Sequence, residues 1–149
     1  MSLEELNRLF QRDLDKLKHE IELYTDESKL WVVKEGISNS AGNLALHLIG
    51  NLKFFIGHDL GGVVYHRNRE REFGAKGEPR EGLITEILEV KEILEKALLN
   101  LHPKRLDDMS LHAFFGHPMT IGFFLIHLYG HFNYHLGQIN YHRRLVTGS

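Results

Sequence analysis

Two histidines four residues apart carry the clearest chemistry in this sequence. They are His131 and His135, in the run HFNYHLGQ that spans residues 131–138. In an α-helix, residues at this spacing lie one turn apart on one face, and Phe124 and Leu128 share that face. The two imidazoles therefore point where the hydrophobic core residues of the helix point.

A pair of imidazoles directed into a core needs partners, because an unpaired buried polar group costs about 1–3 kcal/mol. A divalent metal ion would use both rings at once. The alternative is that core hydroxyl or carbonyl groups bind the two rings separately. The spacing alone leaves both interpretations open.

Composition restricts what such a site can contain. The chain has 149 residues, 11 histidines, no cysteine and a net charge of −2. The length predicts one domain over residues 1–149, and the charge argues against nucleic-acid binding. Without cysteine there is no thiolate ligand and no cysteine nucleophile, so a metal would be held by histidine, carboxylate or water. No leader-like or membrane-spanning segment is evident, so we expect a cytoplasmic protein that does not bind a membrane.

Apolar periodicity predicts four long helices and no strand. Their expected ranges are 2–24, 40–59, 83–101 and 119–145, with a short extended or irregular segment at 31–33. Three glycines in the last helix, Gly122, Gly130 and Gly137, suggest close helix packing or space beside a site. The sequence therefore predicts an all-α protein, a four-helix bundle with a long loop between its second and third helices.

That long loop, of about twenty residues, predicts either a functional loop or a short embedded helix. It contains three arginines, Arg67, Arg69 and Arg71, with Glu70 and Glu72 interleaved. The arginines could bind an anion, but the alternating charges favour a solvated, salt-bridged segment.

A metal site built on His131 and His135 needs a third ligand from another helix. The candidates are His47, His58, His112, His117 and His127. His47 is the best, since it is in mid-helix on an apolar face, whereas His58 is about 16 Å further along the axis. His142 shares the azimuth of the pair but is two turns beyond it, and His19 lies on a polar face. No Glu-x-x-His and no His-Glu-x-x-His is present, which argues against a di-iron bundle and a zincin protease.

These residues also carry a resemblance. The pattern HxxxHxGQ at 131–138, paired with His47 in a second helix, resembles the DinB-like family of bacterial four-helix bundles. YHLGQI at 134–139 is its most specific part, and RNRE at 67–70 with Phe73 resembles an uncharacterised subgroup. The resemblance covers most of the chain. It implies an up-down-down-up bundle, a tendency to form homodimers, and a divalent metal, often zinc or nickel, on His47, His131 and His135.

Three protein ligands leave a coordination position open for water or substrate. Characterised members of the family include metal-dependent transferases that use low-molecular-weight thiols, so the resemblance implies a thiol S-transferase acting on a small-molecule substrate. Alternatives are a non-catalytic bundle that binds a metal, a small molecule or a partner, a metal-dependent hydrolase, and a structural bundle without metal. Near the expected ligands, Asn51, Asn133, Tyr134 and Gln138 offer polar groups. Asn51 and Gln138 would contact either a substrate or the ligand rings.

Overall fold

Every long element of the chain is a helix. The structure is a computed structural model that describes residues 1–113 and 116–149. Its α-helices are α1 (Leu3–Glu22), α2 (Ala41–Leu52), α3 (Arg69–Gly74), α4 (Arg80–Asn100) and α5 (Ile121–Thr147). The only β pairing in the described part is an isolated bridge between Met109 and Thr120. The all-α class is therefore confirmed, with five α-helices where the sequence predicted four.

Short helical turns extend or connect these elements. A π-helical turn, η2 (Lys53–His58), continues α2 directly, so the two together fill the range predicted for the second helix. The 3₁₀ helices η1 (Glu27–Trp31) and η3 (Pro103–Asp107) lie in connections. Trp31, expected in an extended or irregular segment, ends η1 instead, because Asp26 caps that turn by accepting from the Ser28 N–H at 3.0 Å.

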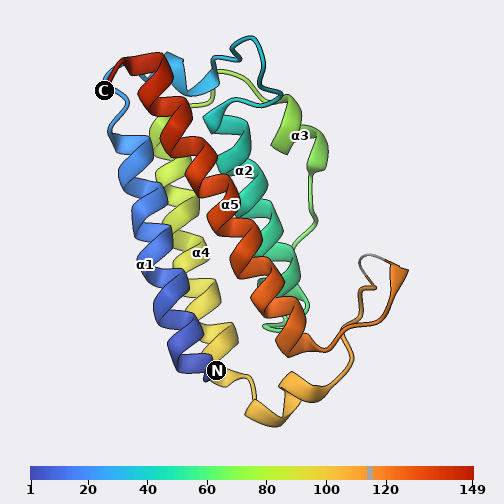
Figure 1. The fold of residues 1–149 in the computed structure, drawn as a ribbon. Coiled ribbons are helices and arrows are strands. Elements are labelled where there is room, and N and C mark those ends of the chain that lie inside the picture. The colour runs from blue at the N-terminus through green and yellow to red at the C-terminus, as the bar shows by residue number, and fades with distance from the viewer. Residues whose placement is uncertain (114–115) are drawn as a thin grey trace.

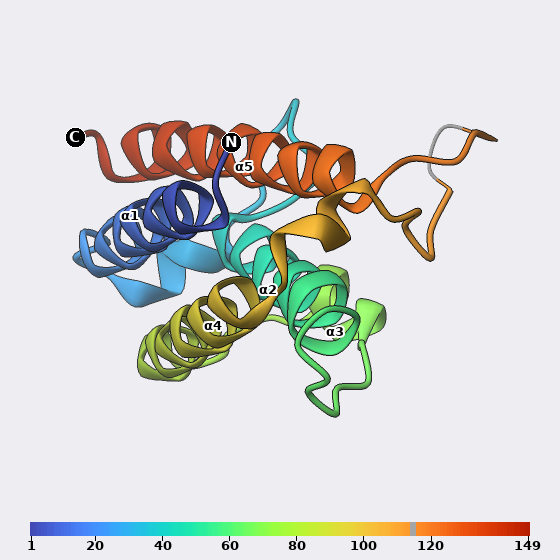
Figure 2. The same ribbon diagram turned by 90° about the horizontal axis from the view of Figure 1, so that it is seen from below.

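The four long helices run side by side around one core, as Figures 1 and 2 show. From the blue N-terminus, α1 runs in one direction, α2 and α4 run in the opposite direction, and α5 runs parallel to α1 (Figure 1). The short α3 lies outside this group, against α2. Along α1 the predicted apolar face is buried: Leu6, Phe10, Leu14, Leu17 and Ile21 are at most 2% exposed.

A buried carboxylate fixes the rotation of α5. Asp13 of α1, which is 0% exposed, accepts hydrogen bonds from the Tyr129 hydroxyl at 2.5 Å and the Asn133 amide at 3.1 Å. Burial would raise the pKa of Asp13, but hydrogen bonds from Arg12, Tyr129 and Asn133 outweigh burial and lower it. Residues 129 and 133 are on the side of α5 away from 131 and 135, because each residue turns the helix by about 100°. Docking on Asp13 therefore turns the two histidines toward α2.

A buried histidine anchors the far end of α5. His142 accepts from the Tyr24 hydroxyl at Nδ1 (2.6 Å) and donates from Nε2 to the carbonyl of Val32 (2.8 Å). The first contact requires the neutral ring, because Nδ1 accepts only when it carries no proton, whereas Nε2 donates in either form. Burial lowers the pKa of His142, which keeps this ring neutral in the folded protein.

We expect the free energy of unfolding of the metal-free protein to fall as the pH drops below about 6.5, the ordinary pKa of histidine. Below that pH the unfolded chain takes up a proton that folded His142 resists, so acid favours unfolding. His131 and His135, whose pKa values are also lowered, act in the same direction. Urea unfolding at a series of pH values will measure the slope. His142→Gln, which cannot titrate, should give a shallower slope; an unchanged slope would contradict this role of His142.

Within the described residues, no helix combines the length and the apolar character needed to cross a bilayer.

Candidate metal centre

Three histidines from two helices converge between α2 and α5. His47 of α2 and His131 and His135 of α5 each offer a nitrogen, and these nitrogens all lie within 4.8 Å of one another. Nε2 of His47 is 3.2 Å from Nε2 of His131, and the rings of His47 and His135 have centroids 5.3 Å apart. In the part of the chain that the structure describes, no other group of histidines and carboxylates is arranged this way. The structure thus brings together the three residues that the sequence selected.

The two α5 histidines are held in the neutral form that metal binding would require. Burial is the main cause that lowers the pKa of His131, to about 4, and the positive charges that His135 and His47 would carry add to it. Burial also lowers the pKa of His135. Near neutral pH, both α5 rings can therefore offer a lone pair to a cation without first losing a proton.

A carboxylate from α3 orients His47. Nδ1–H of His47 donates to Oε1 of Glu72 at 3.0 Å, so the lone pair of that ring lies on Nε2, toward His131. Burial would raise the pKa of Glu72, but hydrogen bonds from His47 and Arg67 and the charge of Arg67 outweigh burial and lower it. A ligand histidine that donates its other N–H to a carboxylate is typical of protein metal sites.

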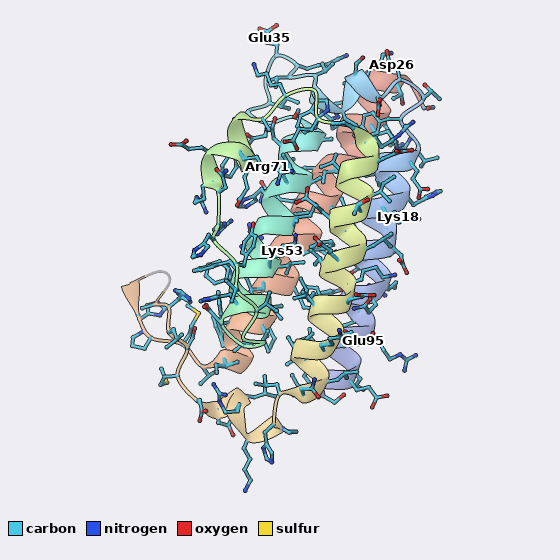
Figure 3. The ribbon with its side chains drawn as sticks, turned by 180° about the vertical axis from the view of Figure 1, so that it is seen from behind. Lys18, Asp26, Glu35, Lys53, Arg71 and Glu95 are labelled. Atoms are coloured by element: carbon cyan, nitrogen blue, oxygen red, sulfur yellow. The ribbon has the colours of Figure 1, made fainter. Side chains whose placement is uncertain are left out.

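Arg67 completes this arrangement. Its Nε donates to Oε2 of Glu72 at 2.9 Å and its Nη2 donates to Oε1 at 3.0 Å, a two-pronged ion pair. The side chains are 11% exposed for Arg67 and 4% for Glu72. The prediction of a solvated segment is therefore wrong for this pair. It is correct that the segment is salt-bridged, since Arg71, labelled in Figure 3, pairs with Glu78 and with Glu86 of α4.

Gln138 orients the ring of His135 as Glu72 orients the ring of His47. Nδ1–H of His135 donates to Oε1 of Gln138 at 2.7 Å, which leaves Nε2 of His135 as the free nitrogen. Of the two interpretations open for Gln138, contact with a ligand ring is the one that the structure shows. Asn133, by contrast, is bound to Asp13, away from the site, and Tyr134 is exposed beside His135, with ring centroids 5.2 Å apart.

The three histidines could therefore hold a divalent metal ion, but two buried polar atoms on the same two helices have no hydrogen-bond partner within residues 1–113 and 116–149. Nδ1 of His131 is buried and has no hydrogen-bond partner among the described residues. Oδ1 of Asn51 is buried and equally unpaired within the same part of the chain. Native structures rarely leave such atoms unpaired.

Side-chain contacts hold α3, and with it Glu72, against α2. The Asn43 amide donates to the backbone carbonyls of Glu72 (3.1 Å) and Ala75 (2.9 Å). Asn68 caps the start of α3 by accepting from the Arg71 N–H at 3.0 Å. A six-residue helix is too short to be stable alone, so these contacts are what place its carboxylate at His47.

Gly50 makes room for that carboxylate. A Cβ at this position would lie 2.8 Å from Cδ of Glu72 and would overlap Oε2. We expect Gly50→Ala to weaken metal binding by displacing Glu72, although alanine is the better helix former by about 1 kcal/mol. Titration with zinc against a chromophoric chelator will give the affinity.

Gly130→Ala is the matched control for this test. A Cβ there meets nothing within 4 Å, and the residue is exposed in mid-α5. This variant should keep the metal affinity and gain up to about 1 kcal/mol of stability. Gly137 has equally open surroundings. Of the three glycines in α5, the expected role in close packing therefore holds for Gly122, where a Cβ would lie 3.2 Å from the carbonyl of Leu106.

The remaining histidines lie outside the cluster. His58 ends η2 in a half-exposed position, bonded to Asp59 at 3.0 Å, and His112 bonds to the same carboxylate at 2.6 Å. His127 neighbours His131 with ring centroids 6.4 Å apart but does not belong to the three-nitrogen group. His117, another of the candidates, is exposed, and so is His19, which the sequence placed on a polar face.

Glu72 is the residue of the candidate site that the sequence did not single out. Its signal was indirect: Gly50, three residues after His47 and so on nearly the same face of α2, leaves space beside that histidine. No protein-family model matches this chain, and no curated protein matches it either.

Proposed function

We propose that this protein binds a divalent metal ion, zinc or nickel, through His47, His131 and His135. The observation that carries the proposal is the convergence of three histidine nitrogens from two helices within 4.8 Å. Two of the three rings also have their other nitrogen bound to an acceptor, Glu72 or Gln138. Bundles commonly build metal sites from side chains on facing helices.

We further propose that the chain is a DinB-like bundle. Two features support this. The four long helices run up, down, down and up in chain order (Figure 1), and the three histidines come from the second and the last of them. These are the arrangements that the resemblance at residues 134–139 implies. The short α3, which supplies Glu72, is an addition to these four long helices.

The chemistry we propose is transfer of a small electrophile to a low-molecular-weight thiol. A bound divalent cation would act as a Lewis acid that lowers the pKa of a thiol or water molecule. With three histidine ligands, a position stays open for such a molecule. The chain contains no cysteine, so the thiol would come from a second substrate and not from the protein.

Metal analysis of protein purified without a histidine tag tests the first step. We expect close to one equivalent of zinc or nickel per chain and a lower melting temperature after chelation. Less than about a tenth of an equivalent, with unchanged melting after chelation, would contradict metal binding. A screen of bacterial thiols with a generic electrophile then tests transfer; metal-loaded protein that accelerates none of these reactions would favour a non-catalytic binding protein.

A further inference from the structure

Two unpaired atoms face the same helix interface beside the histidine cluster. They are Nδ1 of His131 and Oδ1 of Asn51, both buried and without a partner among the described residues. We propose that Asn51 is a positioning residue for the metal centre: when the cation binds, Nδ1–H of His131 donates to Oδ1 of Asn51, directly or through one water molecule. This inference rests on the proposed metal binding.

The antiparallel register of α2 and α5 places Asn51 about one helical turn from His131 along the interface between the two helices. His47 contacts His131, and eight residues further along the chain Phe55 contacts Phe124, with ring centroids 5.0 Å apart. Asn51 lies midway between these two contacts, so it is level with residues 127 and 128 on α5. It also follows His47 by one helical turn, on the same face.

The tilt of helical side chains directs the two groups toward each other. In a helix, side chains lean toward the N-terminus of their own helix. His131 therefore leans along α5 toward residues 127 and 128, where Asn51 lies. Asn51 leans along α2 toward His47, and thus toward His131, because α2 and α5 run in opposite directions (Figure 1).

Without metal the two atoms form no hydrogen bond with each other, and the proton positions also disfavour one. Nδ1 of His47 donates to Glu72, so Nε2 of His47 is an acceptor, and the contact at 3.2 Å requires Nε2 of His131 to carry the proton. Nδ1 of His131 and Oδ1 of Asn51 are then both acceptors, and two acceptors cannot form a hydrogen bond.

A cation reverses this arrangement. With a cation on Nε2, neutral His131 would carry its proton on Nδ1 instead, and this N–H would be the donor that Oδ1 of Asn51 lacks. All three ligand rings would then donate to an acceptor: His47 to Glu72, His135 to Gln138, and His131 to Asn51. Asn51 thus has a function only in the metal-bound protein.

Asn51→Leu separates this role from an ordinary structural one. We expect the variant to bind zinc about 10–100-fold more weakly, measured by competition with a chromophoric chelator. The melting temperature of the metal-free variant should stay the same or rise, because leucine removes an unpaired carbonyl. Asn51→Asp, which keeps the acceptor, should retain most of the affinity. Asn7→Leu, which replaces a buried asparagine on α1, should leave zinc affinity unchanged.

A direct readout is the tautomer of His131, seen in ¹⁵N NMR spectra of the imidazole. In the wild type we expect the proton on Nε2 without metal and on Nδ1 with zinc. If wild type binds zinc and Asn51→Leu binds it equally well, the inference is wrong and the metal site stands. Equal loss of stability with and without metal would show a structural role and also overturn it. Wild type that binds no zinc would overturn both proposals.

Discussion

Replacing His135 with alanine will abolish metal retention through purification. A three-histidine site that loses one ligand keeps only two. Its affinity for the metal should fall by more than the roughly 10–100-fold typical of losing a residue that hydrogen-bonds to a ligand. His47→Ala should have an effect as large, because the two rings come from different helices and the cation joins them. Metal content and zinc affinity of each variant will measure the loss.

His58→Ala is the control for His47→Ala. It removes a histidine that follows α2 in the same continuous helical segment, but its side chain is 47% exposed and bonds to Asp59. His19→Ala, on the exposed face of α1, is a second control, and both variants should keep their metal. If His58 proved indispensable and His47 dispensable, the assignment of ligands to helices would be wrong.

The convergence of the three histidines could be predicted because they are in mid-helix on apolar faces. In a regular helix the direction of a side chain follows from its position, so the arithmetic of about 100° per residue placed His47, His131 and His135 toward a core. The same arithmetic puts Asn133 about 200° from His131, facing α1. On that side of α5 the amide of Asn133 donates to the buried carboxylate of Asp13.

Glu72 could not be predicted in the same way. Its position depends on the path of the chain between η2 and α3, which has no periodicity. Its neighbours alternate in charge as they would in a solvated segment. Only the folded chain shows that Asn43 holds α3 against α2 and that Gly50 leaves room for the side chain of Glu72. It also shows that Arg67 turns inward to pair with Glu72. Helix faces are a local property of the sequence, whereas this contact is tertiary.

Glu72→Ala will produce the largest loss of stability among the variants of the site. It leaves the guanidinium of Arg67, whose side chain is 11% exposed, without its carboxylate. Breaking a buried ion pair from one side costs about 3–5 kcal/mol. The same change removes the acceptor of Nδ1–H of His47, so zinc should bind about 10–100-fold more weakly. Urea unfolding of the metal-free protein and competition for zinc will measure the two effects separately.

The double variant Arg67→Met/Glu72→Leu distinguishes the two roles of Glu72. Replacing both partners by apolar groups of similar size leaves no unpaired charge, so most of the lost stability should return. Zinc affinity should stay low, because His47 still lacks an acceptor on Nδ1. If the double variant recovered both stability and affinity, Glu72 would serve only to neutralise Arg67. If it recovered affinity but not stability, the orientation of His47 would have to come from another group.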